Sequence, residues 1–218
     1  MEIKAVIFDM DGVIFDTERV YLDEWIEIFK EYGYIMEKDL YISVMGRGRK
    51  KVKEIFKGYY GKDLPIEEMY IKKDKMLKVA IDNNEVPLKK GAIEILDYLN
   101  SKKIKVALAT SAKRERLEKQ LNAFNIRNKF QGIVSGDDIE NSKPNPDIFL
   151  KAAKILEVDP KNCIVIEDSP AGIKAAYNAK MMPLHVEDLK EADDEIKELS
   201  YAHFKNLEDI KNFINERI

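Results

Sequence analysis

The sequence has little of what marks a secreted, membrane-bound or nucleic-acid-binding protein. It contains one cysteine, Cys163, among 218 residues, so no intrachain disulfide can form and a reducing compartment is indicated. Acidic residues at Glu2, Asp9 and Asp11 interrupt the apolar stretch near the start. Because neither a signal-peptide core nor a run of about 18 apolar residues is found there or later, we expect a cytoplasmic protein that does not contact a membrane.

An excess of positive charge is also missing. Lys and Arg number 37 against 40 Asp and Glu, which gives a formal net charge of -3, so a nucleic-acid partner is not indicated. Charged mixtures such as residues 188–199 are typical of solvated helix faces. No repeat, low-complexity linker or obvious exposed apolar stripe stands out, and we therefore expect a monomer.

The sequence does contain a pattern of short apolar runs rich in β-branched residues, which predict strands. They cover residues 3–8, 104–110, 130–136, 162–168 and 182–186. Segments with helical spacing lie between them, with apolar positions on one face, such as Leu117, Leu121 and Phe124, or Phe149, Ala152, Ala153 and Leu156. Strands alternating with helices imply right-handed crossovers, so the predicted fold class is α/β, a doubly wound parallel sheet.

Residues 17–84 break this alternation. They hold amphipathic stretches at 21–33, 50–61 and 69–81 and no convincing buried strand. We therefore expect a helical-bundle domain over 17–84, inserted after the first strand, and an α/β core domain formed by 1–16 and 85–218.

Polar residues follow the predicted strands, where ligands of open α/β sheets collect. They are Asp9 and Asp11 after the first strand, Thr110 and Ser111 after the second, Asp137 and Asp138 after the third, Lys143 in the next loop, and Glu167 and Asp168 after the fourth. Several carboxylates share a small space only when a cation neutralises them, and oxygen ligands suit a hard ion such as Mg²⁺. A calcium-binding EF-hand is excluded, because Val13, Ile14 and Val20 stand where that loop needs an oxygen ligand, glycine and glutamate.

Two of these strand ends also lead into predicted helices. Ser111 is expected to be the N-cap of the helix that follows it, and the amides there could bind an anion, with Thr110 the better candidate for a phosphate contact. Ser169 is expected to be an N-cap as well, with Pro170 at the first helical position. Lys143, taken alone, is typical of a solvated surface lysine.

Taken together, the ordered motifs resemble the haloacid dehalogenase superfamily of phosphotransferases. The motifs are "DMDGV" at 9–13, Thr110 after an apolar strand, Lys143 before "PNPD", and "EDS" at 167–169. The insertion point after the first motif, "DTE" at 16–18 before Trp25, and "SKPNPDIF" at 142–149 resemble the helical-cap branch that contains β-phosphoglucomutase and small sugar-phosphate phosphatases.

The resemblance implies a role for each residue. Asp9 would attack phosphorus and form an aspartyl-phosphate, while Asp11 would first protonate the leaving oxygen and then deprotonate water. The phosphoryl oxygens would be held by Thr110, Ser111 and Lys143. Mg²⁺ would be bound by Asp9, the backbone carbonyl of Asp11, Glu167 and Asp168. The predicted activity is Mg²⁺-dependent hydrolysis of a small phosphomonoester, namely a sugar, polyol or nucleotide phosphate.

The helical insert would act as a cap that covers the site and selects the substrate. Its "MGRGRKK" segment carries Arg47 and Arg49, which could grip an anionic or polyhydroxyl group, although solvated loop arginines are an alternative for each. Two departures from the family pattern stand out. Tyr21 occupies the place where mutases of this branch are expected to carry histidine, and Lys180 stands where relatives usually have glycine, so it must end a helix without glycine's access to positive φ.

Other functions stay open at this point. A phosphomutase would use the same nucleophile, and a non-catalytic phospho-ligand binder could share the fold. A dehalogenase is poorly supported, because its chemistry needs no metal-binding acidic pair such as Glu167 and Asp168. A cysteine hydrolase is disfavoured because Cys163 begins an apolar strand, where it reads as a small core residue, and because His185 and His203 have no acid–base motif around them.

Overall fold

The computed structural model of the protein describes residues 2–45, 49–189 and 191–218. The chain divides into two compact units, one formed by 1–16 with 87–218 and the other by 17–86. The boundary expected from the sequence, between 84 and 85, lies two residues from this division.

The larger unit is built on a parallel sheet of six strands in the order β3-β2-β1-β4-β5-β6. The strands are β1 (Ala5–Phe8), β2 (Lys105–Ala109), β3 (Gly132–Val134), β4 (Cys163–Glu167), β5 (Met182–Val186) and β6 (Ala202–Phe204). Every pairing is parallel, which confirms the predicted fold class. The strand order reverses between β1 and β4, and ligands of such sheets bind beyond the strand ends at that point.

Five strands coincide with the predicted apolar runs, whereas β6 was missed. It has three residues, none of them fully buried, so it lacks the continuous apolar run that identifies the others.

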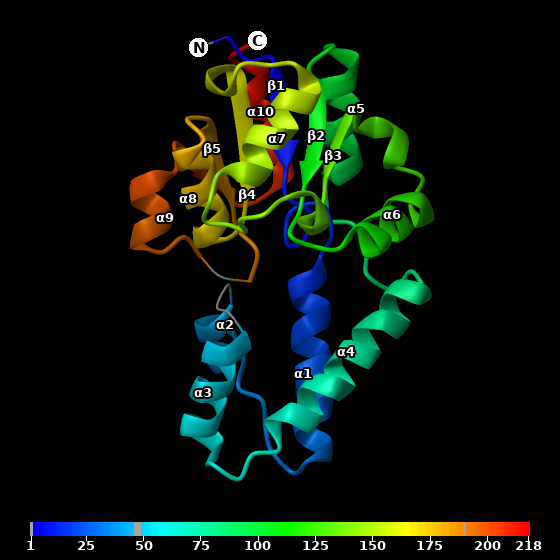
Figure 1. The fold of residues 1–218 in the computed structure, drawn as a ribbon, viewed down its shortest axis with the longest axis vertical. Helices are drawn as coiled ribbons and strands as arrows, with labels where there is room; N and C mark the ends of the chain where they lie inside the picture. The colour runs from blue at the N-terminus through cyan, green and yellow to red at the C-terminus, as the bar shows by residue number, and fades with distance from the viewer. Residues whose placement is uncertain (1, 46–48, 190) are drawn as a thin grey trace. The chain divides into compact units, whose positions relative to one another are not determined.

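Helices cover both faces of the sheet, as Figure 1 shows. Those of this unit are α5 (Ala92–Ser101), α6 (Arg114–Ala123), α7 (Asp147–Leu156), α8 (Pro170–Asn178), α9 (Asp194–Leu199) and α10 (Leu207–Asn215), with 3-10 turns η1 (Arg127–Lys129), η2 (Gly136–Asp138) and η3 (Pro160–Asn162). On one face, α7 and α8 bury Phe149, Ala152 and Ala176 against Ile7 and Val165 of the central strands. On the other face, α5 and α10 pack against each other and against β2 and β5.

The smaller unit consists of α1 (Thr17–Glu31), α2 (Lys38–Val44), α3 (Arg49–Tyr60) and α4 (Ile66–Asp82) in its described part. Aromatic side chains form its core. The ring of Trp25 lies 5.7 Å from Phe29, 5.7 Å from Phe56 and 4.9 Å from Tyr70 between centroids, each in an edge-to-face arrangement that the ring quadrupoles favour.

The chain leaves the larger unit and returns to it at adjacent points. Asp16 N–H donates to the carbonyl of Pro87 at 2.9 Å, and Phe15 forms an isolated antiparallel bridge with Leu88. The smaller unit is therefore inserted where the two ends of the larger unit already meet.

In the described residues, no helix combines the length and apolar character that a bilayer crossing requires.

Candidate active site

Asp9 lies directly beyond the end of β1. Its backbone N–H donates to the carbonyl of Ile166 in β4 at 3.0 Å, so the sheet ladder fixes Asp9 at the point where the strand order reverses. Only 7% of the residue is exposed. Burial and the charge of Glu167 raise the pKa of the Asp9 carboxyl to about 7, although Lys143 acts to lower it.

The turn after Asp9 requires Gly12. This residue has a φ of +74°, and a Cβ atom there would overlap the carboxylate of Asp168. Glycine therefore allows both the left-handed backbone and the close approach of the acidic loop that follows β4. Asp11 is half-buried beside this turn.

Lys143 brings its ammonium group into this acidic site. Its Nζ lies 2.5 Å from Asp9 Oδ1 and 2.6 Å from Glu167 Oε1, and 9% of its side chain is exposed. Burial acts to lower the pKa of Lys143, but the charges of Asp9 and Glu167 outweigh it and raise the pKa above the ordinary lysine value. The reading of Lys143 as a solvated surface lysine is thus wrong.

Glu167 ends β4 and accepts hydrogen bonds on both oxygens. Oε1 accepts from Lys143, while Oε2 accepts from Asp168 N at 3.0 Å and from Ser169 N and Oγ at 2.9 Å each. A Cβ atom at Gly172, in the first turn of α8, would overlap the Glu167 carboxylate. The absence of a side chain at Gly172 therefore leaves the space that the Glu167 carboxylate occupies. Through its hydrogen bonds, Glu167 holds Lys143 and the Asp168 loop in place.

The carboxylates fit a hard cation. Asp9, Glu167 and Asp168 each offer an oxygen within 4.8 Å of the others, and Asp11 is close by in the chain. Lys143 pairs with Asp9 and Glu167, and Arg116 pairs with Asp11. Carboxylate oxygens gathered in this way suit a hard cation such as Mg²⁺.

Thr110 lies at the end of β2, next to β1, with 1% of the residue exposed. Its Oγ1 accepts a hydrogen bond from Ala112 N at 3.0 Å, so its own proton remains for a further acceptor. Ser111 is exposed, and its expected role as N-cap is wrong because α6 begins only at Arg114, with Lys113 at the cap position. The Arg114 N–H is instead satisfied by the carboxylate of Asp137 at 2.8 Å.

Asp137 and Asp138 do not join the acidic cluster. Asp137 binds the start of α6, while Asp138 accepts from Ser135 N and Oγ at 2.7 Å each and forms an ion pair with Arg114. Both carboxylates secure the loop after β3. At the next strand, the prediction of Ser169 as an N-cap is confirmed, because its Oγ accepts from Gly172 N at 3.1 Å.

Motif reading missed two groups beside the site. The Arg116 guanidinium donates to Asp11 Oδ1, and Lys89 Nζ lies 2.5 Å from Asp188 Oδ1 and 3.7 Å from Asp16 Oδ1. Neither residue directly follows a strand, so the search for polar residues at strand ends did not find them. For Arg116, the sequence offered one signal, namely its spacing of one helical turn from Gln120, a polar residue that the structure buries.

The smaller unit contains the remaining predicted residues. Arg49 forms a two-pronged ion pair with Asp74, at 3.0 and 2.8 Å, and its guanidinium lies 4.6 Å above the ring of Tyr70. Arg47 lies outside the described residues. The ring of Tyr21 has Lys73 Nζ 3.7 Å above it.

Cys163 cannot serve as a nucleophile in this site. It is fully buried at the start of β4, the opposite end of that strand from Asp168, and burial raises the pKa of its thiol to about 12. His185 is also fully buried, which lowers its pKa to about 4. The structure therefore agrees with the prediction of Cys163 as a small core residue.

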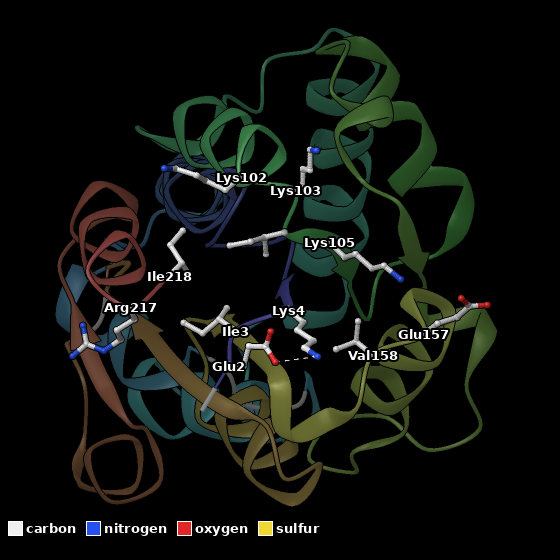
Figure 2. Close-up of a pocket in the computed structure, with 11 residues that line it drawn as sticks. Glu2, Ile3, Lys4, Lys102, Lys103, Lys105, Glu157, Val158, Arg217 and Ile218 are labelled. Atoms are coloured by element: carbon white, nitrogen blue, oxygen red, sulfur yellow. Dashed lines mark ion pairs between the residues drawn. The ribbon is translucent and has the colours of Figure 1, made fainter.

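A hollow of about 710 Å³ lies at the amino-terminal ends of the strands, opposite the strand ends that carry Asp9 and Glu167. Figure 2 shows Ile3 and Ile218 beside it, with the charged ends of Lys102, Lys105 and Arg217 directed away from it. It contains no convergent carboxylates and is separate from the site at Asp9.

Known proteins resemble this chain in sequence and in fold. A model of the family described as haloacid dehalogenase-like hydrolase matches residues 6–186. The Arabidopsis thaliana protein SUPPRESSOR OF QUENCHING 1, chloroplastic, is 36% identical over 192 residues, which cover 83% of this chain but 17% of that longer protein. The Thermotoga maritima protein named phosphorylated carbohydrates phosphatase is 33% identical over 177 residues, 81% of each chain.

A crystal structure from Thermotoga maritima, provisionally named a β-phosphoglucomutase, matches 100% of both chains with a TM-score of 0.79 and 30% sequence identity. The family match spans most of the chain and includes Asp9, Thr110 and Glu167 at strand ends and Lys143 in the loop before α7. The chain belongs to the haloacid dehalogenase-like hydrolase family.

Proposed function

We propose that this protein is a Mg²⁺-dependent phosphatase that hydrolyses a small phosphomonoester through an aspartyl-phosphate on Asp9. The observation that carries the proposal is the Lys143 ammonium bound between Asp9 and Glu167, 2.5 and 2.6 Å away, where the strand order reverses. This arrangement fixes one carboxylate oxygen of Asp9 beside a cation that can also bind phosphoryl oxygens. The similarity to a phosphorylated carbohydrates phosphatase supports the same reaction class.

The residues present fit the metal, and we propose Asp9, Asp168, Glu167 and the backbone carbonyl of Asp11 as the groups that hold it. Glu167 already accepts four hydrogen bonds, so its main contribution is to orient Lys143 and the Asp168 loop. When bound, Mg²⁺ would neutralise the charge that otherwise repels a phosphate ester from a carboxylate nucleophile.

The reaction then follows from the positions of two aspartates. An oxygen of Asp9 forms a bond to phosphorus while the ester P–O bond breaks, and the leaving oxygen takes a proton from Asp11. In the second step a water molecule attacks phosphorus, its proton passes to the Asp11 carboxylate, and the bond from phosphorus to Asp9 breaks. Lys143 and the hydroxyl of Thr110 hold phosphoryl oxygens throughout, with Ser111 kept as a further proposed contact.

Substrate choice would belong to the helical unit, acting as a cap. Arg49 is a proposed contact for the part of the substrate that is not transferred, but it would have to share its guanidinium with Asp74. The proposed substrates are therefore small sugar, polyol or nucleotide phosphates.

A phosphomonoester panel, assayed for phosphate release with Mg²⁺ and with EDTA, tests the proposal. We expect release that EDTA abolishes and that Asp9→Asn reduces by at least about a thousandfold, because the amide is a poor nucleophile. Lys161→Met is a matched surface control, since its partner Asp159 lies outside the site. Metal-independent release, or release that persists in Asp9→Asn, contradicts the proposal.

A phosphomutase of the β-phosphoglucomutase type is the second candidate, because the matching crystal structure carries that provisional name. Tyr21 disfavours it, since mutases of this branch are expected to have a histidine there. Conversion of β-glucose 1-phosphate to the 6-phosphate faster than release of phosphate would reverse the ranking.

A further inference from the structure

Arg116 of α6 holds one oxygen of the Asp11 carboxylate. Its Nη2 donates to Asp11 Oδ1, and its Nε donates to Gln120 Oε1 at 3.0 Å, one turn further along the helix. Gln120 is 2% exposed, and 20% of the Arg116 side chain is exposed. A buried amide therefore fixes the orientation of the guanidinium that binds Asp11.

The other oxygen of Asp11 remains accessible. In the part of the chain that the structure describes, Asp11 Oδ2 has no recorded hydrogen-bond or ion-pair partner, and 26% of the side chain is exposed. The main chain of this turn is held separately, because Ile14 N and Phe15 N both donate to Met10 O, at 3.0 and 2.9 Å. Among the described residues, Arg116 is thus the recorded contact that decides where the carboxylate of Asp11 points.

The start of α6 does not depend on this contact. Arg114 N donates to Asp137 at 2.8 Å, and the Arg114 guanidinium forms an ion pair with Asp138, so the loop after β3 already secures the helix. A single ion pair that stays partly exposed also contributes little to stability. The pairing of Arg116 with Asp11 therefore needs an explanation in the chemistry of Asp11.

The proposed reaction uses Asp11 twice at the same place. In the first step Asp11 gives a proton to the ester oxygen as the P–O bond breaks, and in the second step it takes a proton from the attacking water. Both transfers occur on the side of phosphorus opposite Asp9, because attack and departure are in line. A carboxyl group that turned freely would spend part of its time out of reach, whereas one held at Oδ1 keeps Oδ2 in a single direction.

We propose that Arg116 is a positioning residue for these proton transfers: it binds Asp11 Oδ1 and thereby directs Oδ2 first to the ester oxygen and then to water. This inference rests on the proposed phosphatase function. Oδ2 gives one proton to the alcohol product and regains one from water, while Arg116 keeps its own protons throughout. The bond to Oδ1 suits both steps, since a protonated carboxyl retains a carbonyl oxygen that accepts.

Two esters that differ in their need for a proton test this role. The first is the sugar, polyol or nucleotide phosphate of the panel that the wild type hydrolyses fastest, because its alkoxide must be protonated as it leaves. The second is p-nitrophenyl phosphate, whose p-nitrophenolate leaves without a proton, so that a single turnover measures attack by Asp9 alone.

Arg116→Met, in the full chain with Mg²⁺, should affect the two esters differently. We expect kcat for the alkyl ester to fall by about tenfold or more with KM within about twofold, since general acid–base catalysis supplies about 10²- to 10⁴-fold. The single-turnover rate of p-nitrophenolate release should change by less than about threefold. A merely structural role would lower both rates together.

Further variants assign the effect to the contact with Asp11. Asp11→Asn should show the same selective loss, larger in size, and Arg116→Lys, which lacks the guanidinium fork that also binds Gln120, should lie between Arg116→Met and the wild type. Arg127→Met is the matched control, because the Arg127 guanidinium pairs with Glu118 outside the site, and it should leave both rates unchanged. Circular dichroism identifies a variant that does not fold. If Arg116→Met is one, Arg116→Lys carries the same comparison of the two esters.

Failure of the inference differs from failure of the proposed function. An equal loss on both esters, or an unchanged kcat for the alkyl ester, refutes the positioning role and leaves the phosphatase proposal standing. If no sugar, polyol or nucleotide phosphate of the panel releases phosphate with Mg²⁺, the phosphatase proposal fails and the inference fails with it.

Discussion

At the scale of single residues, the smaller unit contains a buried carboxylate that the site does not use. Glu24 of α1 is 6% exposed, and neither of its carboxylate oxygens has a hydrogen-bond partner in the described residues. Burial raises its pKa from 4.5 to about 7, although Lys73 of α4 acts to lower it. Lys73 is itself buried, which lowers its own pKa. In the sequence, both residues look like ordinary surface charges of amphipathic helices.

Glu24 should make stability depend on pH. Its folded-state pKa lies above the unfolded value, so its contribution is fully present below about pH 4.5 and is lost as the pH rises through about 7. Glu24→Gln cannot ionise and avoids that loss. From pH 5 to pH 8, the difference in unfolding free energy should move in favour of the variant by about 1 kcal/mol, allowing for solvent screening. Urea unfolding at four pH values measures it.

Glu68→Gln is the matched control, since Glu68 is exposed on α4 of the same unit and is not among the charges that act on the Glu24 carboxyl. Its unfolding free energy should follow the pH dependence of the wild type. Parallel curves for wild type and Glu24→Gln would show that Glu24 is not ionising in a desolvated environment, and the interpretation of its burial would then be wrong.

At the scale of elements, α8 ends in a conformation that glycine would adopt more easily. Lys180 has a φ of +61°, its N–H donates to Tyr177 O at 3.0 Å, and the N–H of Met181 donates to Ala176 O at 3.2 Å. These two bonds form a Schellman motif, in which the left-handed residue is usually glycine. The prediction that Lys180 ends this helix without glycine is borne out by its backbone geometry.

Lys180→Gly should therefore stabilise the protein. A left-handed conformation costs a residue with a Cβ atom about 1 kcal/mol or more, part of which glycine returns through its greater freedom when unfolded. We expect a gain of about 0.5–1 kcal/mol, or a rise of roughly 1–4 °C in Tm, measured by calorimetry. Lys154→Gly, at an exposed position inside α7, should show the opposite sign, near 1 kcal/mol of destabilisation. Loss of stability in both variants would contradict the argument.

At the scale of the whole molecule, the periodicity of apolar residues predicts the sheet. It does not predict the side-chain contacts at the carboxyl ends of the strands. Five strands were found because each is a continuous apolar run, and the acidic residues at their ends were grouped because parallel strands present their carboxyl ends together. The burial of Lys143 depends on a loop that folds back over Asp9, and no pattern within that loop encodes its direction. The position of Arg116 likewise depends on the angle of α6, which begins at Arg114, two residues later than an N-cap at Ser111 predicts.

The two-unit organisation makes the larger unit a candidate for independent folding. All six strands of the sheet belong to this unit. The ends left by removing 17–86 are already joined by the hydrogen bond from Asp16 N to Pro87 O at 2.9 Å. Replacing 17–86 with a linker of about four Gly and Ser residues would close a short loop at little entropic cost. We expect this shortened chain to unfold cooperatively in urea, as followed by circular dichroism.

The same shortened chain separates the chemistry from substrate selection. If the proposed site is complete within the larger unit, the chain without 17–86 should still hydrolyse an activated ester such as p-nitrophenyl phosphate in a Mg²⁺-dependent way, because every group proposed to contact phosphorus comes from residues 9–168 outside the insert. Its discrimination among natural esters should fall, since the helical unit proposed to select them is gone. Asp9→Asn in the shortened chain must abolish the activity. A cooperatively folded but inactive product would show that the helical unit supplies a group that the chemistry itself needs.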